Sequence, residues 1–292
     1  MEERLSDDDV NVLMSSIRTG TPLAEARRQE FVVNTKALLA NARSYNETCH
    51  HLADLCLEEV EKFDPAVRDD WKDGVVEEIQ WWWTWINTLR RQGKLASWAH
   101  LRDRPFPFED AVTQFPAGIA LRCLNIGCGP RPDMGQQSAA DIEFVHMDPL
   151  APAYNKLMRF LNAPGGGDVV FGAVEFLGQM DLEPFDFIAA KNCLDHAYDV
   201  PRGLEQMISC LGKRGMISLG HYENEAEAQN YMGFHKWNIE VRDGRIRVWS
   251  KNASEVFDHE SAGFRLEVVR EDRRKASGQT HPFLDLTLIR GW

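Results

Sequence analysis

The sequence lacks several features that would assign it to a specialised class of protein. None of its six cysteines forms a Cys-x-x-Cys pair, and we expect free cysteines that act as small hydrophobic residues in a reduced compartment. No apolar run approaches the roughly 18 residues of a membrane span. The first ten residues, MEERLSDDDV, are acidic and contain no signal-peptide core. We therefore expect a cytoplasmic protein without a membrane partner.

An excess of positive charge is also missing. The chain has 33 Lys and Arg against 45 Asp and Glu, which gives a formal net charge of −12. Proteins that bind duplex DNA or RNA need clustered Lys and Arg to neutralise the phosphates. Nucleic acid is therefore not an expected partner.

Internal repeats and low-complexity segments are absent too, and the pattern instead changes once along the chain. Residues 1–115 are predicted to be helical, with helices at Glu25–Ala42, Tyr45–Phe63 and Trp71–Leu89, since their apolar residues recur at helical spacing. Asp64-Pro65 is predicted to start the third of these helices, with Asp64 as the N-cap. The proline-rich segment 104–108 is predicted to be a linker.

Four tryptophans stand close together at positions 81, 82, 83 and 85. Consecutive residues of a helix cannot all face one side, so some of these rings must meet another surface. They either pack against the rest of the chain or form an aromatic platform for a ring-bearing substrate such as a sugar. A contact with a second subunit would also use them, which leaves a homodimer open.

From Ile119 onward, short apolar runs alternate with helical segments, which predicts a mainly parallel sheet. The expected strands are Leu121–Ile126, Ile142–Met147, Val169–Phe171, Phe185–Ala190 and Met216–Leu219, and the expected helices are Pro152–Leu161 and Arg202–Leu211. Gly212 and Gly215 are predicted to close the second helix. Phe264–Val269 and Phe283–Ile289 are expected to pair antiparallel at the sheet edge, and a hairpin is expected to turn at Asp243-Gly244.

The stretch from Leu121 to Leu150 contains the clearest binding signal. Gly127-Cys128-Gly129 ends the first apolar strand abruptly, and glycines allow a tight turn and close approach of a ligand. The second strand ends on Asp148, 19 residues past Gly129. An acid at this place can bind both hydroxyls of a ribose. The pair of features predicts a site for a nucleoside-containing cofactor.

A dinucleotide fingerprint would have a third glycine where this chain has Pro132. The ordered motifs between Leu121 and about Gly220 instead resemble those of class I S-adenosylmethionine-dependent methyltransferases of the methyltransferase type 11-like kind. The motifs that carry the resemblance are Leu124–Gly129, Asp148, Gly172–Leu177, Phe185–Ile188, Asn192–His196 and Leu211–Ile217. The resemblance implies an α/β fold with a Rossmann-like class I methyltransferase sheet, mainly parallel with an antiparallel terminal strand, behind an N-terminal helical region.

The resemblance also implies a set of cofactor-binding residues for S-adenosylmethionine. They are Asn125, Gly127, Cys128, Gly129, Asp148, Pro149, Val174, Glu175 and Asn192. The chain departs from the family by having Asn125 in place of an acid and Ala173 in place of a common Asp. These departures leave open a non-catalytic binding or regulatory protein. An NAD(P)-dependent oxidoreductase is a further alternative, which Pro132 disfavours.

Polar side chains at the expected carboxyl ends of the strands are candidates for catalysis. His196, His221 and His235 are the candidate bases, because a hydroxyl acceptor must lose its proton during methyl transfer. The segment 221–238 resembles a bacterial subgroup associated with sugar and surface-polysaccharide tailoring. The prediction is therefore O-methylation of a small, sugar-containing or natural-product-like acceptor.

A metal is not required by this prediction. An alternative is a magnesium site built from Asp195 with Glu223 or Glu225, which would resemble catechol-type O-methyltransferases. In the predicted organisation, residues 1–115 form the helical region, used as a lid or for substrate or oligomer contacts. Residues 116–292 then form the S-adenosylmethionine-binding methyltransferase domain.

Overall fold

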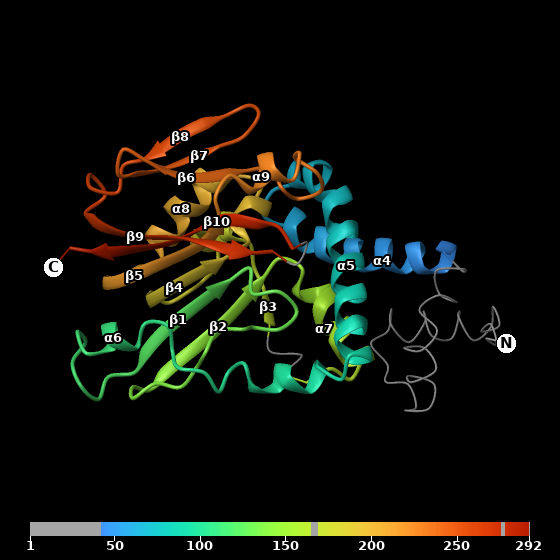
Figure 1. The fold of residues 1–292 in the computed structure, drawn as a ribbon, viewed down its shortest axis with the longest axis horizontal. Helices are drawn as coiled ribbons and strands as arrows, with labels where there is room; N and C mark the ends of the chain where they lie inside the picture. Colours follow the sequence, from blue (N-terminus) through green and yellow to red (C-terminus); the bar gives the residue numbers. More distant parts are fainter. Residues whose placement is uncertain (1–41, 165–168, 276–277, 292) are drawn as a thin grey trace. The chain divides into compact units, whose positions relative to one another are not determined.

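The computed structural model describes residues 42–164, 169–275 and 278–291 (Figure 1). The helix expected at Glu25–Ala42 lies outside these residues, apart from Ala42. The chain forms two compact units. Of the described residues, the first unit contains 42–104, 129–135, 149–164 and 169–171, and the second contains the remainder.

Helices dominate the first unit. They are α4 (Ala42–Glu61), α5 (Val67–Arg91), the 3-10 helix η1 (Leu95–His100) and α7 (Ala151–Phe160). The helices expected at Tyr45–Phe63 and Trp71–Leu89 are confirmed as α4 and α5. The prediction that Asp64 is the N-cap is wrong, since α5 begins at Val67 with Ala66 as its N-cap. The Asp64 carboxylate instead accepts a hydrogen bond from the Ala66 N–H at 3.0 Å and stabilises the turn before the helix.

The four tryptophans of α5 divide between the interior and the surface of the first unit. Trp83 is 1% exposed, and its ring lies 5.0 Å from that of Tyr45. Trp81 and Trp85 are 51% and 36% exposed and stack on each other at 5.8 Å. The helix therefore buries one ring and presents a stacked aromatic pair on its surface.

A seven-stranded sheet has the order β3-β2-β1-β4-β5-β10-β9 (Figure 1). Its strands are β1 (Leu121–Ile126), β2 (Ile142–Asp148), β3 (Val169–Phe171), β4 (Phe185–Lys191), β5 (Leu211–Tyr222), β9 (Phe264–Arg274) and β10 (Thr280–Arg290). Strands β1, β2, β4 and β5 are parallel, and β10 is antiparallel to both β5 and β9. This arrangement confirms the predicted fold class, and the order β3-β2-β1-β4-β5 is that of doubly wound nucleotide-binding sheets.

Short helices in the second unit connect its strands. They are α6 (Glu109–Val112), η2 (Val174–Gln179), η3 (Leu194–His196), α8 (Val200–Ser209) and α9 (Glu225–Ala228). The helix predicted at Arg202–Leu211 is α8, which starts two residues earlier because the Asp199 carboxylate accepts from the Arg202 N–H at 3.0 Å. The prediction that Gly212 and Gly215 close this helix is wrong, since both lie within β5.

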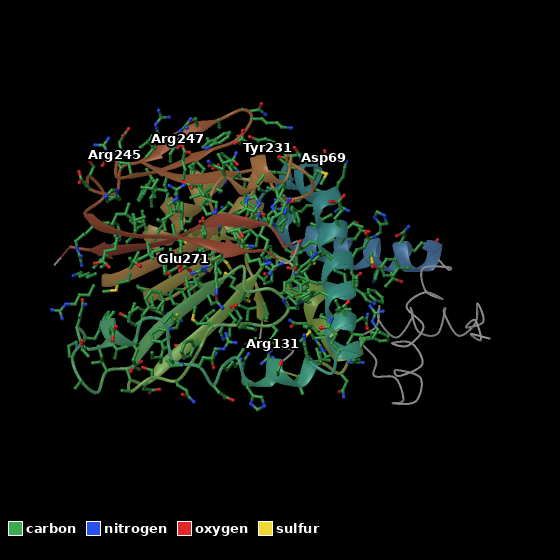
Figure 2. All side chains as sticks on the ribbon, viewed as in Figure 1. Asp69, Arg131, Tyr231, Arg245, Arg247 and Glu271 are labelled. Carbon is green, nitrogen blue, oxygen red and sulfur yellow. The ribbon has the colours of Figure 1, made fainter. Side chains whose placement is uncertain are left out.

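A separate three-stranded sheet follows β5 in the chain. It consists of β6 (Asn238–Arg242), β7 (Arg245–Trp249) and β8 (Ser254–Phe257). The predicted hairpin is confirmed, with Asp243 and Gly244 at φ values of 51° and 75°. Arg247, labelled in Figure 2, donates from β7 to Glu240 on β6 at 2.8 Å.

The core of the second unit lies between the large sheet, α8 and the small sheet. Its most deeply buried members include Leu124, Phe185, Ile188, Ile217, Ile246 and Leu286. The apolar strands predicted from the sequence supply most of these side chains, so burial of apolar surface holds the strand ends in place. No helix among the described residues has the length and apolar character needed to cross a membrane.

Candidate functional site

The carboxyl ends of β1 and β4 mark the point where the strand order of the large sheet reverses. In register, Ile126 pairs with Ala190, and Lys191 on β4 pairs with Gly220 on β5. In open α/β sheets, ligands bind outside the carboxyl ends of the strands at this reversal. Of the predicted site residues, Gly127 and Cys128 follow the end of β1, and Asn192 and His196 follow the end of β4.

Gly127 ends β1 in a conformation that suits glycine, with φ +59°. A Cβ built at this position would lie 2.4 Å from the Cβ of Cys193, which follows β4. The Cys193 thiol in turn donates to the carbonyl oxygen of Ile126 at 3.4 Å. The turns after β1 and β4 are therefore in direct contact, and only a residue without a side chain fits between them.

Cys128 and Gly129 continue this turn, although they fall in different units. The Cys128 N–H donates to the Met147 carbonyl at 3.4 Å, which joins the turn to β2. Gly129 belongs to the first unit and has φ +68°, and a Cβ there would lie 2.9 Å from the Trp82 ring. Pro149 also belongs to the first unit and lies just before α7.

Asp148 is the last residue of β2 and is 5% exposed. Its backbone carbonyl accepts from the Gly172 N–H at 3.4 Å, which places the start of the next segment beside it. The sequence therefore predicted correctly that an acid ends the second strand. Whether its carboxylate binds ribose stays a prediction.

Asn125 lies within β1 and is 5% exposed. Its Nδ2 lies 3.4 Å from Nδ1 of His146, its register partner on β2. Nε2 of His146 lies 2.8 Å from Nε2 of Gln136. Two buried polar side chains, Asn125 and His146, therefore lie side by side two residues before the turn at Gly127. Sequence reasoning missed His146 and Gln136, and the only signal was one histidine inside the apolar run of β2.

Val174 and Glu175 begin the 3-10 helix η2, and both are buried. The Glu175 carboxylate accepts hydrogen bonds from the backbone N–H groups of Tyr198 at 2.8 Å and Asp199 at 3.4 Å. Burial raises the pKa of Glu175 to about 7, although these hydrogen bonds lower it. The carboxylate therefore stabilises the start of α8.

Asn192 directly follows β4 and has a left-handed conformation, with φ +51°. Its N–H donates to the Gly220 carbonyl on β5 at 2.6 Å. Its side chain is exposed. This turn directs the chain into the segment that contains Asp195 and His196.

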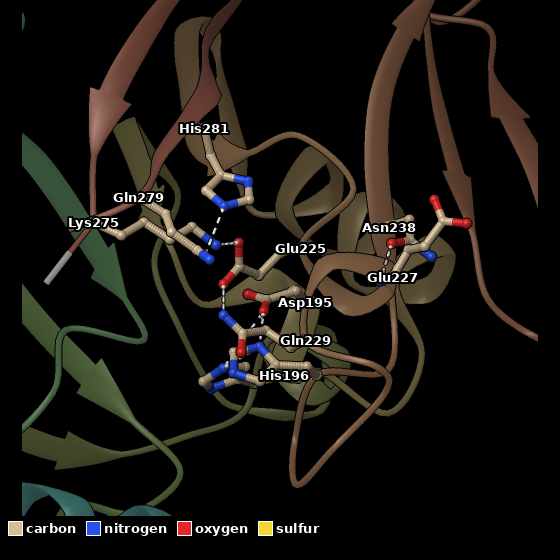
Figure 3. Close-up of polar contacts among 10 residues, drawn as sticks. Asp195, His196, Glu225, Glu227, Gln229, Asn238, Lys275, Gln279 and His281 are labelled. Carbon is tan, nitrogen blue, oxygen red and sulfur yellow. Dashed lines mark hydrogen bonds and ion pairs between the residues drawn. The ribbon is translucent and has the colours of Figure 1, made fainter. Parts of the chain in front are cut away.

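Asp195 and His196 follow β4 (Figure 3). His235, which lies just before β6, joins them in a tight polar cluster. Nδ1 of His235 lies 2.6 Å from Oδ2 of Asp195 and 3.2 Å from Nε2 of His196. Nε2 of His196 lies 3.5 Å from the same carboxylate oxygen. The structure thus brings together two of the predicted candidate bases and the predicted acid.

Backbone hydrogen bonds hold the two halves of this cluster together. The Asp195 carbonyl accepts from the N–H groups of Lys236 at 3.0 Å and Trp237 at 3.3 Å. Left-handed conformations at Asn230 and Tyr231 form the tight loop that leads to His235. Backbone hydrogen bonds therefore fix the segment that contains Asp195 and His196 beside the segment that contains His235.

The neighbouring histidines lower the pKa of Asp195. Burial by itself raises the pKa of Asp195, but the charges of His196, His235 and His221, with the hydrogen bond from His235, lower it to about 2. Asp195 is therefore a carboxylate at neutral pH. Its side chain is 3% exposed, whereas those of His196 and His235 are 23% and 27% exposed.

The third candidate base, His221, lies near the end of β5 and is 2% exposed. Burial lowers its pKa to about 4, against the opposing effect of Asp195. Its Nε2 has no hydrogen-bond partner among the described residues. His221 is therefore a neutral, interior imidazole next to the cluster.

Glu223 and Glu225 do not join Asp195 in one group of carboxylates. Glu223 forms an ion pair with Arg270. Glu225 pairs with Lys275 and accepts from Gln229 at 2.9 Å (Figure 3). Lys275 follows β9, 50 residues beyond Glu225, and nothing in the sequence pattern signalled this buried pair.

Comparisons with known proteins add similarity of fold. The chain matches no protein-family model and no curated protein. Among solved structures, it is similar to the N-methyltransferase NodS from Bradyrhizobium japonicum WM9 in complex with S-adenosyl-L-homocysteine (TM-score 0.38, 13% identity, 68% of this chain and 86% of that chain). It is also similar to a possible histamine N-methyltransferase from Thermotoga maritima (0.37, 15%, 73% and 99%) and to an S-adenosylmethionine-dependent methyltransferase from Methanosarcina mazei (0.37, 10%, 64% and 98%). The fold class itself rests on strand order and register.

Proposed function

We propose that the protein is an S-adenosylmethionine-dependent methyltransferase that methylates a hydroxyl group of a small acceptor. The observation that carries the proposal is that Gly127 and Asp148 directly follow the register pair of Ile126 and Met147, at the carboxyl edge of a doubly wound sheet. A side chain at position 127 would collide with Cys193, and Asp148 ends the neighbouring strand. A nucleoside cofactor needs this combination of a bare backbone turn and a ribose-binding acid.

The residues present fit the cofactor at its nucleoside end. Asp148 would bind the ribose hydroxyls, and the turn at Gly127 and Cys128 would approach the methionine portion. Ala173 is 1% exposed and offers no carboxylate to the adenine amino group, so the backbone of Val174 and Glu175 would recognise the base. Asn125 would contribute an amide in place of the more common acid.

S-adenosylmethionine, when bound, supplies a methyl carbon that is made electrophilic by a positively charged sulfur. An acceptor oxygen that took this methyl group would have to lose its hydroxyl proton, and residues of this chain would hold the acceptor and accept that proton. Positioning of the acceptor against the methyl group is the main task of the protein. The cluster of Asp195, His196 and His235 is where this chain can activate the hydroxyl, with His221 beside it in the interior.

The acceptor class follows from charge and from the resemblance of segment 221–238. A net charge of −12 favours a small molecule over nucleic acid. The resemblance to sugar-tailoring methyltransferases favours a sugar-containing or natural-product-like alcohol. Six free cysteines are in keeping with a reduced, cytoplasmic setting.

Calorimetric titration of the full chain with S-adenosylmethionine tests the proposal, with NAD as the control ligand. We expect micromolar binding of S-adenosylmethionine and none of NAD. Asp148→Ala should lose at least about tenfold in affinity, because a charge-assisted hydrogen bond contributes about 1.5–3 kcal/mol. The exposed Asp181→Ala is the matched control and should bind like wild type.

Three other outcomes of these titrations would contradict the proposal. NAD binding would favour the oxidoreductase alternative. Absence of S-adenosylmethionine binding would favour a non-catalytic member of the fold, in keeping with Asn125 and Ala173. Unchanged affinity in Asp148→Ala would remove the ribose assignment.

A further inference from the structure

Three side chains of the second unit direct one metal-binding atom each toward the same small region. Oδ2 of Asp195, Nε2 of His196 and Nδ1 of His235 are separated from one another by 2.6, 3.2 and 3.5 Å. We infer that these residues form a binding site for one divalent transition-metal ion, for which Zn²⁺ is the best match.

The three contacts of this cluster cannot all be ordinary two-centre hydrogen bonds at the same time. Nδ1 of His235 has either one hydrogen or one lone pair. If it donates to Asp195, it has no lone pair left for Nε2 of His196, which lies 3.2 Å away. A cation at the centre of the three atoms would instead be bound by one lone pair from each of them, and no hydrogen would be needed between them.

The separations also suit a metal. In a tetrahedral site, bonds of about 2.0–2.2 Å to zinc place neighbouring ligand atoms about 3.3–3.6 Å apart. The separation of 3.5 Å between His196 and Asp195 falls in that range, and that of 3.2 Å between the two histidines lies just below it. The third, between His235 and Asp195, is shorter at 2.6 Å, and a shift of under about 1 Å in one side chain would complete the geometry.

The ligand types select the metal. Two imidazoles and one carboxylate suit zinc and other transition metals, whereas magnesium and calcium prefer oxygen ligands alone. The half-buried histidines, 23% and 27% exposed, leave one side of the site open to solvent. An open position is typical of catalytic rather than structural zinc sites.

Two buried polar atoms provide an independent observation. Oδ1 of Asp195 and Nε2 of His221 have no hydrogen-bond partner in the described parts of the chain. Asp195 and His221 are each 2% exposed. Buried polar groups in native proteins are rarely left unsatisfied. A cation bound at the cluster would give the carboxylate of Asp195 the partner that its Oδ1 lacks.

A metal ion bound by Asp195, His196 and His235 would activate the acceptor hydroxyl at the cluster where the proposed function already places that step. A hydroxyl bound to the ion has a lowered pKa, so it can release its proton to water and present an alkoxide oxygen to the methyl carbon. This use of the site rests on the proposed function, whereas metal binding itself does not.

The test is metal titration of the full chain after treatment with a chelator. We expect one Zn²⁺ per chain by calorimetry, and one Co²⁺ with a visible absorption band that Zn²⁺ abolishes. A large excess of Mg²⁺ should not compete. Zinc binding that Mg²⁺ displaces, or no zinc binding at all, would overturn the inference.

Variants identify the ligands. His235→Ala and Asp195→Asn should each weaken zinc binding at least about 100-fold, more than the loss of an outer partner costs. His281→Ala is the matched control, since His281 contacts Gln279 outside the cluster (Figure 3), and should bind like wild type. Circular dichroism of each variant establishes that it is folded. Equal zinc affinity in folded Asp195→Asn and wild type would overturn the site.

Titration with S-adenosylmethionine separates this inference from the proposed function. Zinc binding without S-adenosylmethionine binding would support the metal site and overturn methyl transfer. S-adenosylmethionine binding without zinc binding would overturn the metal site alone.

Discussion

Two glycines with positive φ, Gly127 and Gly244, are required for different reasons. Gly127 and Gly244 both have positive φ, at +59° and +75°. A Cβ at Gly244 would meet nothing within 4 Å, whereas one at Gly127 would overlap the Cβ of Cys193. The same residue type is thus required for backbone conformation alone at one position, and for conformation and space at the other.

Replacement of these two glycines separates the two requirements. Gly244→Ala should lower the free energy of unfolding by about 1–2 kcal/mol, the cost of a left-handed non-glycine residue. Gly127→Ala should cost about 1–3 kcal/mol more, because the turns after β1 and β4 must move apart. Urea denaturation of both variants measures the difference. Equal losses would show that the contact with Cys193 relaxes without cost.

At the scale of elements, the start of α8 links the site to the sheet. The helix follows η3, which contains Asp195 and His196, and leads into β5. Its first turn depends on the Asp199 carboxylate, which accepts from the Arg202 N–H at 3.0 Å. A helix whose first N–H groups lack such an acceptor is less stable.

Substitution of Asp199 tests this cap. Asp199→Ala should lower the free energy of unfolding by about 1 kcal/mol, within a range of about 0.5–2 kcal/mol. Asp199→Asn should retain most of the stability, because an amide oxygen also caps well. Thermal and urea denaturation measure both. A loss of the same size in the two variants would mean that charge, and not capping, is the contribution of Asp199.

At the scale of the whole molecule, buried charge links folding to pH. Glu175 is 1% exposed, and burial raises its pKa from 4.5 to about 7. The unfolded chain ionises this group near 4.5, so its favourable contribution is fully present below that pH. It is lost as the pH rises through about 7, since the folded protein must then bury a charge.

Glu175→Gln should remove this dependence. Between pH 4.5 and 8, ionisation of Glu175 should cost the wild type about 3 kcal/mol that the variant does not lose. Glu205→Gln, on the exposed face of α8, is the control and should follow the wild type. Urea denaturation across this pH range measures the profiles. Parallel profiles for wild type and Glu175→Gln would contradict the assignment.

The sequence by itself determined where most of the strands lie, although β5 runs over Leu211–Tyr222 where only Met216–Leu219 was expected, and β8 was not predicted. Leu121–Ile126 and Val169–Phe171 were predicted to the residue, because a short apolar run bounded by glycine or acidic residues is a purely local signal of a strand. The same signal located Gly127 and Asp148. Helix ends were less predictable, as at Asp64 and Asp199, because the carboxylate that caps a turn also decides where the helix begins.

Only the tertiary structure decided which polar groups meet. His235 is 40 residues from Asp195, and Gln136 and His146 complete the surroundings of Asn125 through strand register. Contacts of this kind depend on how strands align and how loops close, which no local pattern encodes. Hydrophobic periodicity therefore specified the sheet and the edge where a cofactor would bind, whereas the convergence of Asp195, His196 and His235 arose only from the folded chain.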